Sequence, residues 1–172
     1  MSERYRWGFV GAAIVVALGA FYLARSPVLF FPDGYIYLAH ARQFATSGTW
    51  GINPGETSFS VTSPLWAAIC AAFHFLSSSA DGYVRLMQVV GLATMAASLL
   101  ALDALLQRLE VTPILRALVI VAYAALPLNG FFYAISIMET PLYLLFFFLA
   151  ARLALGEAST RNAVLFGGLC GM

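Results

Sequence analysis

The sequence contains no lysine and little charge of either sign. All nine cationic side chains are arginine, and charged residues make up 10% of the 172 residues. A net charge of +1 provides no basic surface for nucleic acid. The two cysteines, Cys70 and Cys170, lie far apart in apolar runs. This placement favours two buried small side chains over a disulfide or a metal pair.

Short motifs that carry familiar chemistry are also missing. The chain has no Walker or Rossmann glycine pattern and no HExxH, CxxC or GxSxG sequence. We therefore expect no organic cofactor, and the candidates for function are scattered polar residues.

Hydrophobic residues, in contrast, make up 62% of the chain, and the mean hydropathy is +0.86. A helix needs about 20 apolar residues to cross the hydrocarbon core of a bilayer. We therefore predict an all-α, polytopic transmembrane helix bundle. Its expected spans are 7–24, 86–106, 114–135, 141–155 and an incomplete one at 163–172. The chain stops inside this last run, so we expect it to be the N-terminal part of a longer membrane domain.

The arginines predict the orientation. With a cytoplasmic N-terminus, six arginines fall inside and three outside, as the positive-inside rule favours. The inner six are Arg4, Arg6, Arg108, Arg116, Arg152 and Arg161, and the outer three are Arg25, Arg42 and Arg85. The outer face of a plasma membrane would then carry the loop 25–85 and the short turn at Glu139.

The outer loop is predicted to hold two short helices along the membrane, at 34–45 and 64–76, joined by a turn at 53–55. A hydroxyl residue before proline is a typical helix start. This pattern occurs at Ser63, Thr112 and Thr140, which we predict to be N-caps.

Two carboxylates are the main candidates for chemistry. Asp33 stands at the start of the first short helix, where it could be an N-cap or a general base or metal ligand. Glu139 lies between two apolar runs, where a carboxylate is costly unless it faces water or a partner. It could equally be an interfacial residue before the Thr140 cap. Asp103 is expected to find Arg108 or headgroup water and has no catalytic role.

Other polar and aromatic residues of the outer loop are weaker candidates. Glu56 fits a solvated loop carboxylate and His40 an interfacial histidine, while His74 on an apolar helix fits a structural role. The aromatic side chains suit an interface belt or stacking against sugar rings. They are Tyr35, Tyr37, Trp50 and Trp66.

The order of four motifs resembles the GT-C superfamily of integral-membrane glycosyltransferases. The likeness is to its bacterial protein-mannosyltransferase-like and arabinofuranosyltransferase-like branch. The matching stretches are PDGYIYL at 32–38, NPGE at 53–56, SPLW at 63–66 and METPL at 138–142.

The resemblance implies transfer of a sugar from a polyprenyl-phosphate donor to a lipid, glycan or protein acceptor at the outer face. Asp33 would take the position of the family's loop acid, and Arg42 could offset phosphate charge. The family commonly has a second acid directly after the first, where this chain has Gly34. That departure leaves a divalent metal open and makes Glu139 or Glu56 the second carboxylate. A transporter subunit or a scaffold remains the alternative.

Overall fold

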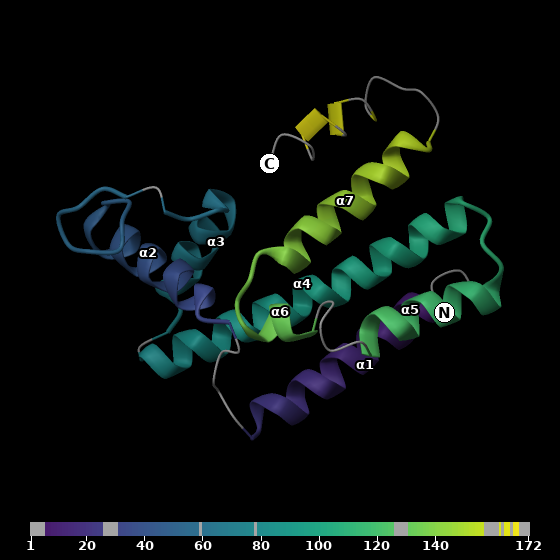
Figure 1. Cartoon of the computed structure of the whole chain (residues 1–172), viewed down its shortest axis with the longest axis horizontal. Coiled ribbons are helices and arrows are strands. Elements are labelled where there is room, and N and C mark those ends of the chain that lie inside the picture. Colours follow the sequence, from purple (N-terminus) through teal and green to yellow (C-terminus); the bar gives the residue numbers. More distant parts are fainter. Residues whose placement is uncertain are drawn as a thin grey trace.

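The computed structural model describes residues 6–25, 31–58, 60–77, 79–125 and 131–156, with 162, 164, 165, 167 and 168 near the C-terminus. Within this part of the chain the fold is all-α and has no strand (Figure 1). Its seven helices are α1 (Arg6–Leu23), α2 (Asp33–Ser47), α3 (Pro64–His74), α4 (Ala80–Arg108), α5 (Pro113–Ala125), α6 (Phe132–Ile135) and α7 (Thr140–Ala154).

Two helices, α1 and α4, are long and apolar enough to cross a membrane. The predicted span 86–106 lies within α4, and the predicted span 7–24 coincides with α1 except for its last residue. The predicted span 114–135 is not one helix, since α5 ends at Ala125 and α6 is a separate short helix. At about 1.5 Å per residue, the 13-residue α5 and the 15-residue α7 are each shorter than a bilayer core. Most of the predicted span 163–172 lies outside the described residues.

A helical bundle forms around α4, which packs against α1 and α7, while α5 packs on α1. Glycines allow the close approach of α1. A Cβ on Gly11 would lie 2.5 Å from a methyl of Ile120, and one on Gly19 would lie 2.5 Å from a methyl of Leu92. Because glycine has no side chain, the neighbouring helices come into direct contact there. Val15, Met95, Leu99 and Ile120 are completely buried in this core.

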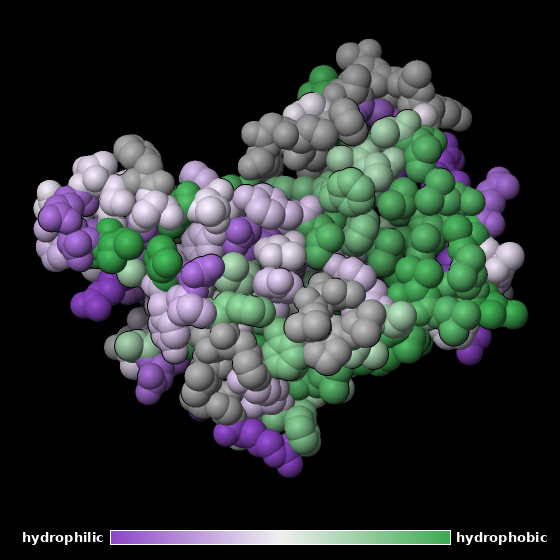
Figure 2. Space-filling model, viewed as in Figure 1, coloured by the Kyte–Doolittle hydropathy of each residue, from purple (hydrophilic) through white to green (hydrophobic). Residues whose placement is uncertain are grey.

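The first turns of α4 extend beyond the bundle and support a second region made by α2 and α3. Tyr83 and Met87 at this end of α4 belong to a separate apolar cluster with Tyr37, Trp66 and Ile137. In Figure 1, α2 and α3 lie at the opposite end of α4 from the N-terminus and the start of α5. Figure 2 shows apolar surface over the bundle and a more polar surface over α2 and α3.

The two short helices expected in the outer loop are present, and the turn between them is confirmed by the Glu56 N–H bond to the Asn53 carbonyl, 3.2 Å. The predicted cap at Ser63 is also confirmed, since its hydroxyl accepts the Trp66 N–H at 3.3 Å. The predicted cap at Thr140 is wrong by one residue. Thr140 is the first helical residue and Glu139 occupies the cap position. α5 begins at Pro113, one residue after Thr112.

Candidate functional site

Asp33 is the first residue of α2 and is exposed to solvent. Pro32 occupies the cap position, and no side chain caps this end. The N-cap reading of Asp33 is therefore wrong. The Tyr35 N–H instead bonds the Pro32 carbonyl at 2.9 Å. Asp33 remains favourably placed, because a carboxylate in a first turn interacts well with the helix dipole.

The chain just before Asp33 is docked on the turn that follows α6. The Phe31 N–H donates to the Ser136 hydroxyl at 3.3 Å. The Phe31 ring stacks on Tyr133, with centroids 4.9 Å apart. The start of α2 is thereby tied to the segment that leads into Glu139, more than 100 residues later in the chain.

A chain of hydroxyls connects α2 to Glu139. The Tyr37 phenol lies 2.5 Å from the Thr62 hydroxyl, which donates to Glu139 Oε1 at 3.1 Å. A threonine hydroxyl has one proton, and an ionised carboxylate can only accept. Because Thr62 gives its proton to Glu139, Tyr37 must donate to Thr62. Tyr37 stands four residues after Asp33, so both project from the same face of α2.

The surroundings keep Tyr37 protonated. Burial is the main cause that raises the pKa of its phenol, the bond to Thr62 partly lowers it, and the nearby Glu139 carboxylate raises it again. Tyr37 therefore acts as a donor at neutral pH. The second oxygen of Glu139, Oε2, is shielded from solvent and has no hydrogen-bond partner. A buried polar atom without a partner is uncommon in native structures and calls for an explanation.

The backbone that presents Glu139 is strained. Ile137 has a φ of 60°, in the left-handed region that a β-branched residue rarely adopts. Trp66 on α3 holds this conformation, because its indole N–H donates to the Ile137 carbonyl at 2.8 Å. Trp66 is only 1% exposed. The interpretation of Trp66 as part of an interface belt or a sugar platform is therefore wrong, and the same holds for Tyr37, at 3%.

The remaining predicted site residues do not join this cluster. His40 is fully buried, with Nδ1 3.0 Å from the Ile36 carbonyl and Nε2 3.2 Å from the Ser60 hydroxyl. Both ring nitrogens are satisfied, so His40 fixes the loop instead of facing a substrate. Glu56 is exposed and accepts a 3.0 Å bond from Asn53 within its own turn.

Arg42 and Tyr35 lie on another face of α2. Arg42 follows Asp33 by nine residues, which is about two and a half helical turns. With Tyr35 it lines a cavity of about 720 Å³ between α2 and the start of α4. Arg42 is therefore directed away from Asp33, and the expectation that the two act at one site is not supported by this geometry.

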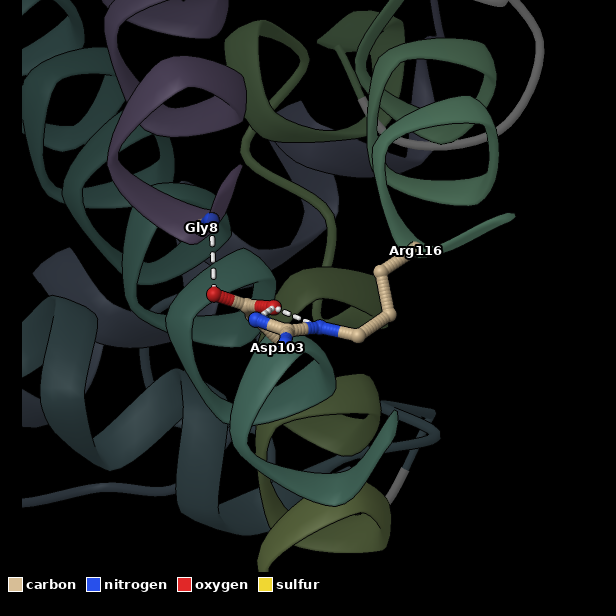
Figure 3. Close-up of polar contacts among 3 residues, drawn as sticks. All are labelled: Gly8, Asp103 and Arg116. Atoms are coloured by element: carbon tan, nitrogen blue, oxygen red, sulfur yellow. Dashed lines mark hydrogen bonds and ion pairs between the residues drawn. The ribbon is translucent and has the colours of Figure 1, made fainter. Parts of the chain in front are cut away.

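The partner expected for Asp103 is wrong. Its Oδ1 accepts from Arg116 Nη2 at 2.6 Å and from Nε at 3.0 Å, while its Oδ2 accepts the Gly8 N–H at 2.9 Å (Figure 3). Arg108 instead donates to the Leu155 carbonyl. The Asp103 carboxylate is completely buried. It links the beginnings of α1 and α5 to the end of α4, which is a structural role.

No metal site accompanies these carboxylates. Across the described ranges, no three His, Cys, Asp or Glu side chains gather closely enough to hold a metal ion. Comparisons with protein-family models, curated proteins and solved structures found no match for this chain.

Sequence reasoning missed Thr62 and misread Tyr37. The spacing of four residues from Asp33 to Tyr37 was a usable signal, because it places both on one helix face. The contribution of Thr62 comes from a loop, and no periodicity predicts where a loop side chain points.

Proposed function

We propose that the protein is a multi-pass membrane glycosyltransferase of the GT-C type. It would move a sugar from a polyprenyl-phosphate donor to an acceptor hydroxyl at the outer face of the plasma membrane. The observation that supports this most is the Tyr37–Thr62–Glu139 chain. It joins the segment of Asp33 to that of Glu139, the two acidic motifs of the resemblance.

Asp33 is the proposed general base. It is an exposed carboxylate in the first turn of α2, where the helix dipole favours negative charge. It would accept the proton of the acceptor hydroxyl as that oxygen attacks the anomeric carbon. The bond from this carbon to the phosphate oxygen breaks, and its electrons leave with the polyprenyl phosphate. One displacement at the anomeric carbon inverts its configuration.

Glu139 is proposed to orient the acceptor. Thr62 fixes one oxygen of this carboxylate and leaves Oε2 without a partner. A hydroxyl of the bound sugar would complete that hydrogen bond after a local shift of the α6–α7 turn that exposes Oε2. Since phosphate is a good leaving group, a base and accurate positioning suffice without a covalent intermediate.

The test uses membranes that contain the complete gene product and a panel of undecaprenyl-phosphate pentoses and hexoses carrying radiolabelled sugar. We expect label to move from the donor to a membrane acceptor, with release of undecaprenyl phosphate. Asp33→Asn should lower the rate by about 10²- to 10⁴-fold, the usual contribution of a general base. The matched control is Glu110→Gln, since Glu110 is an exposed carboxylate of the α4–α5 turn.

The same assay separates the alternatives. A transporter subunit or a scaffold would leave all label attached to the donor. A wild-type rate in the Asp33→Asn variant would refute the assignment of the base, even if transfer itself occurs.

A further inference from the structure

The cavity on the other face of α2 contains charges of both signs from different walls. Arg42 comes from α2 and Asp81 from the first turn of α4. Arg42 and Asp81 do not form an ion pair with each other, since the ion pair among the described residues joins Asp103 and Arg116. Both are exposed and border the same space of about 720 Å³. This volume lies within the range of small-molecule sites.

A histidine also lines this cavity. His74, the last residue of α3, lines it, and its Nδ1 is shielded from solvent and has no hydrogen-bond partner. The His74 ring is held edge-on against Tyr83, with centroids 5.0 Å apart. The His74 ring therefore forms part of the cavity wall, with Nδ1 turned into the protein.

Apolar side chains line part of the cavity, and two exposed apolar residues follow its lining residue His74 in the chain. Phe75 and Leu76, which directly follow His74, are 72% and 70% exposed. Leu38 and Val84 line the cavity itself. Large apolar side chains beside a polar recess suit an amphiphile whose chains remain outside while its headgroup enters.

We propose that this cavity binds a phosphoethanolamine headgroup, with its phosphate on Arg42 and its ammonium group on Asp81. A ligand carrying phosphate alone would meet the Asp81 carboxylate, and a simple cation would meet Arg42. A zwitterion satisfies both walls. Ethanolamine is favoured over choline, because a primary ammonium donates hydrogen bonds to a carboxylate and a quaternary one has no proton to donate. The exposed Phe75 and Leu76 favour a bilayer lipid as its source over soluble phosphoethanolamine.

The test is a thermal-stability titration of the delipidated, detergent-purified full-length protein. The probes are dihexanoyl phosphatidylethanolamine, the corresponding choline and glycerol lipids, and free phosphoethanolamine. We expect the ethanolamine lipid to raise the melting temperature at the lowest concentration. Arg42→Gln and Asp81→Asn should each weaken its apparent affinity by about tenfold, the scale of one lost charge-assisted hydrogen bond.

Arg85→Gln is the matched control, because Arg85 is exposed one turn after Asp81 and does not line the cavity. It should bind the ethanolamine lipid as the wild type does. Melting without lipid shows that each variant is folded. Stronger binding of the glycerol lipid would overturn the zwitterion assignment, as would equal binding of all three lipids or equal behaviour of Arg42→Gln and Arg85→Gln. Free phosphoethanolamine binding as tightly as the lipid would overturn the lipid source.

This site is independent of the proposed transfer reaction. It lies on the face of α2 that points away from Asp33, and its readout is melting temperature instead of sugar transfer. Failure of either experiment therefore leaves the other proposal standing.

Discussion

Asp103 and Glu139 are two carboxylates in apolar surroundings, and their hydrogen bonding differs sharply. Both oxygens of Asp103 are bonded, one to the Arg116 guanidinium and one to the Gly8 N–H. Glu139 has one bond from a neutral hydroxyl and one oxygen without a partner. A carboxylate whose hydrogen bonds are all made within the protein has a structural role. One whose bonding is incomplete has capacity for a ligand.

The two residues also belong to different parts of the molecule. Asp103 lies in the helical bundle, where it joins three helices through a charged partner. Glu139 lies on the turn between α6 and α7, against the α2–α3 region. The hydrogen-bonding capacity of Asp103 is filled by groups of the bundle, whereas Glu139 keeps one oxygen without a partner.

Arg116→Met gives the largest expected effect on this comparison. It leaves the Asp103 carboxylate buried without its counter-charge, which typically costs about 3–5 kcal/mol of unfolding free energy. Chemical unfolding of the purified protein measures this loss. The double variant Asp103→Leu/Arg116→Met removes both charges and should recover most of the stability. A double variant as unstable as the single one would contradict a simple ion-pair role.

Glu139→Gln should have the opposite profile. The amide keeps the acceptor for Thr62 and removes an uncompensated charge, so the free energy of unfolding should not fall. Loss of a charged hydrogen-bond acceptor is worth about 1.5–3 kcal/mol in the bound state. We therefore expect sugar transfer to slow by about 10- to 100-fold. A destabilisation as large as that of Arg116→Met would show that Glu139 is also a structural carboxylate.

Gly91→Ala tests how closely α6, which leads into the Glu139 turn, packs on α4. Gly91 on α4 lies directly against the Ala134 carbonyl oxygen, and an added Cβ would overlap this backbone atom. Overpacking of this kind costs about 1–3 kcal/mol. Gly167→Ala is the control, because its Cβ would meet nothing within 4 Å. Equal unfolding free energies for the two variants would contradict the close contact.

Tyr37→Phe should give the smallest effect, visible in alkaline solution. The pKa of the folded phenol is raised, mainly by burial, above the usual value of about 10. The unfolded phenol ionises first as the pH rises, so this contribution to stability is complete below about pH 10 and is lost above it. The melting temperature should therefore fall less steeply above pH 10 in Tyr37→Phe. An unchanged slope would mean that Tyr37 is accessible.

The sequence predicted the helices better than the contacts between them. Hydrophobic runs located α1 and α4, and the serine–proline pair located the start of α3, because these signals are local. It did not reveal that Asp103 finds Arg116 or that Trp66 bonds Ile137. Such pairings depend on how helices pack, and several arginines were equally plausible partners.

The candidate site was predicted in part. Its two acidic segments were identified, and the structure brings these segments together through Phe31 and Thr62. Helical geometry would have excluded Arg42, since nine residues place it across the helix from Asp33. The burial of His40 could not be read from the chain, because its Ser60 partner lies in an irregular loop.

The left-handed turn at Ile137 has a consequence for the order of assembly. A β-branched residue in this conformation is unfavourable by about 1–3 kcal/mol on its own. The indole of Trp66, which lies 71 residues earlier in the chain, holds Ile137 in this conformation. During synthesis α3 therefore emerges long before the turn that needs it. The α2–α3 region would serve as a template on which the Glu139 turn closes last, and the site would form only once its support is complete.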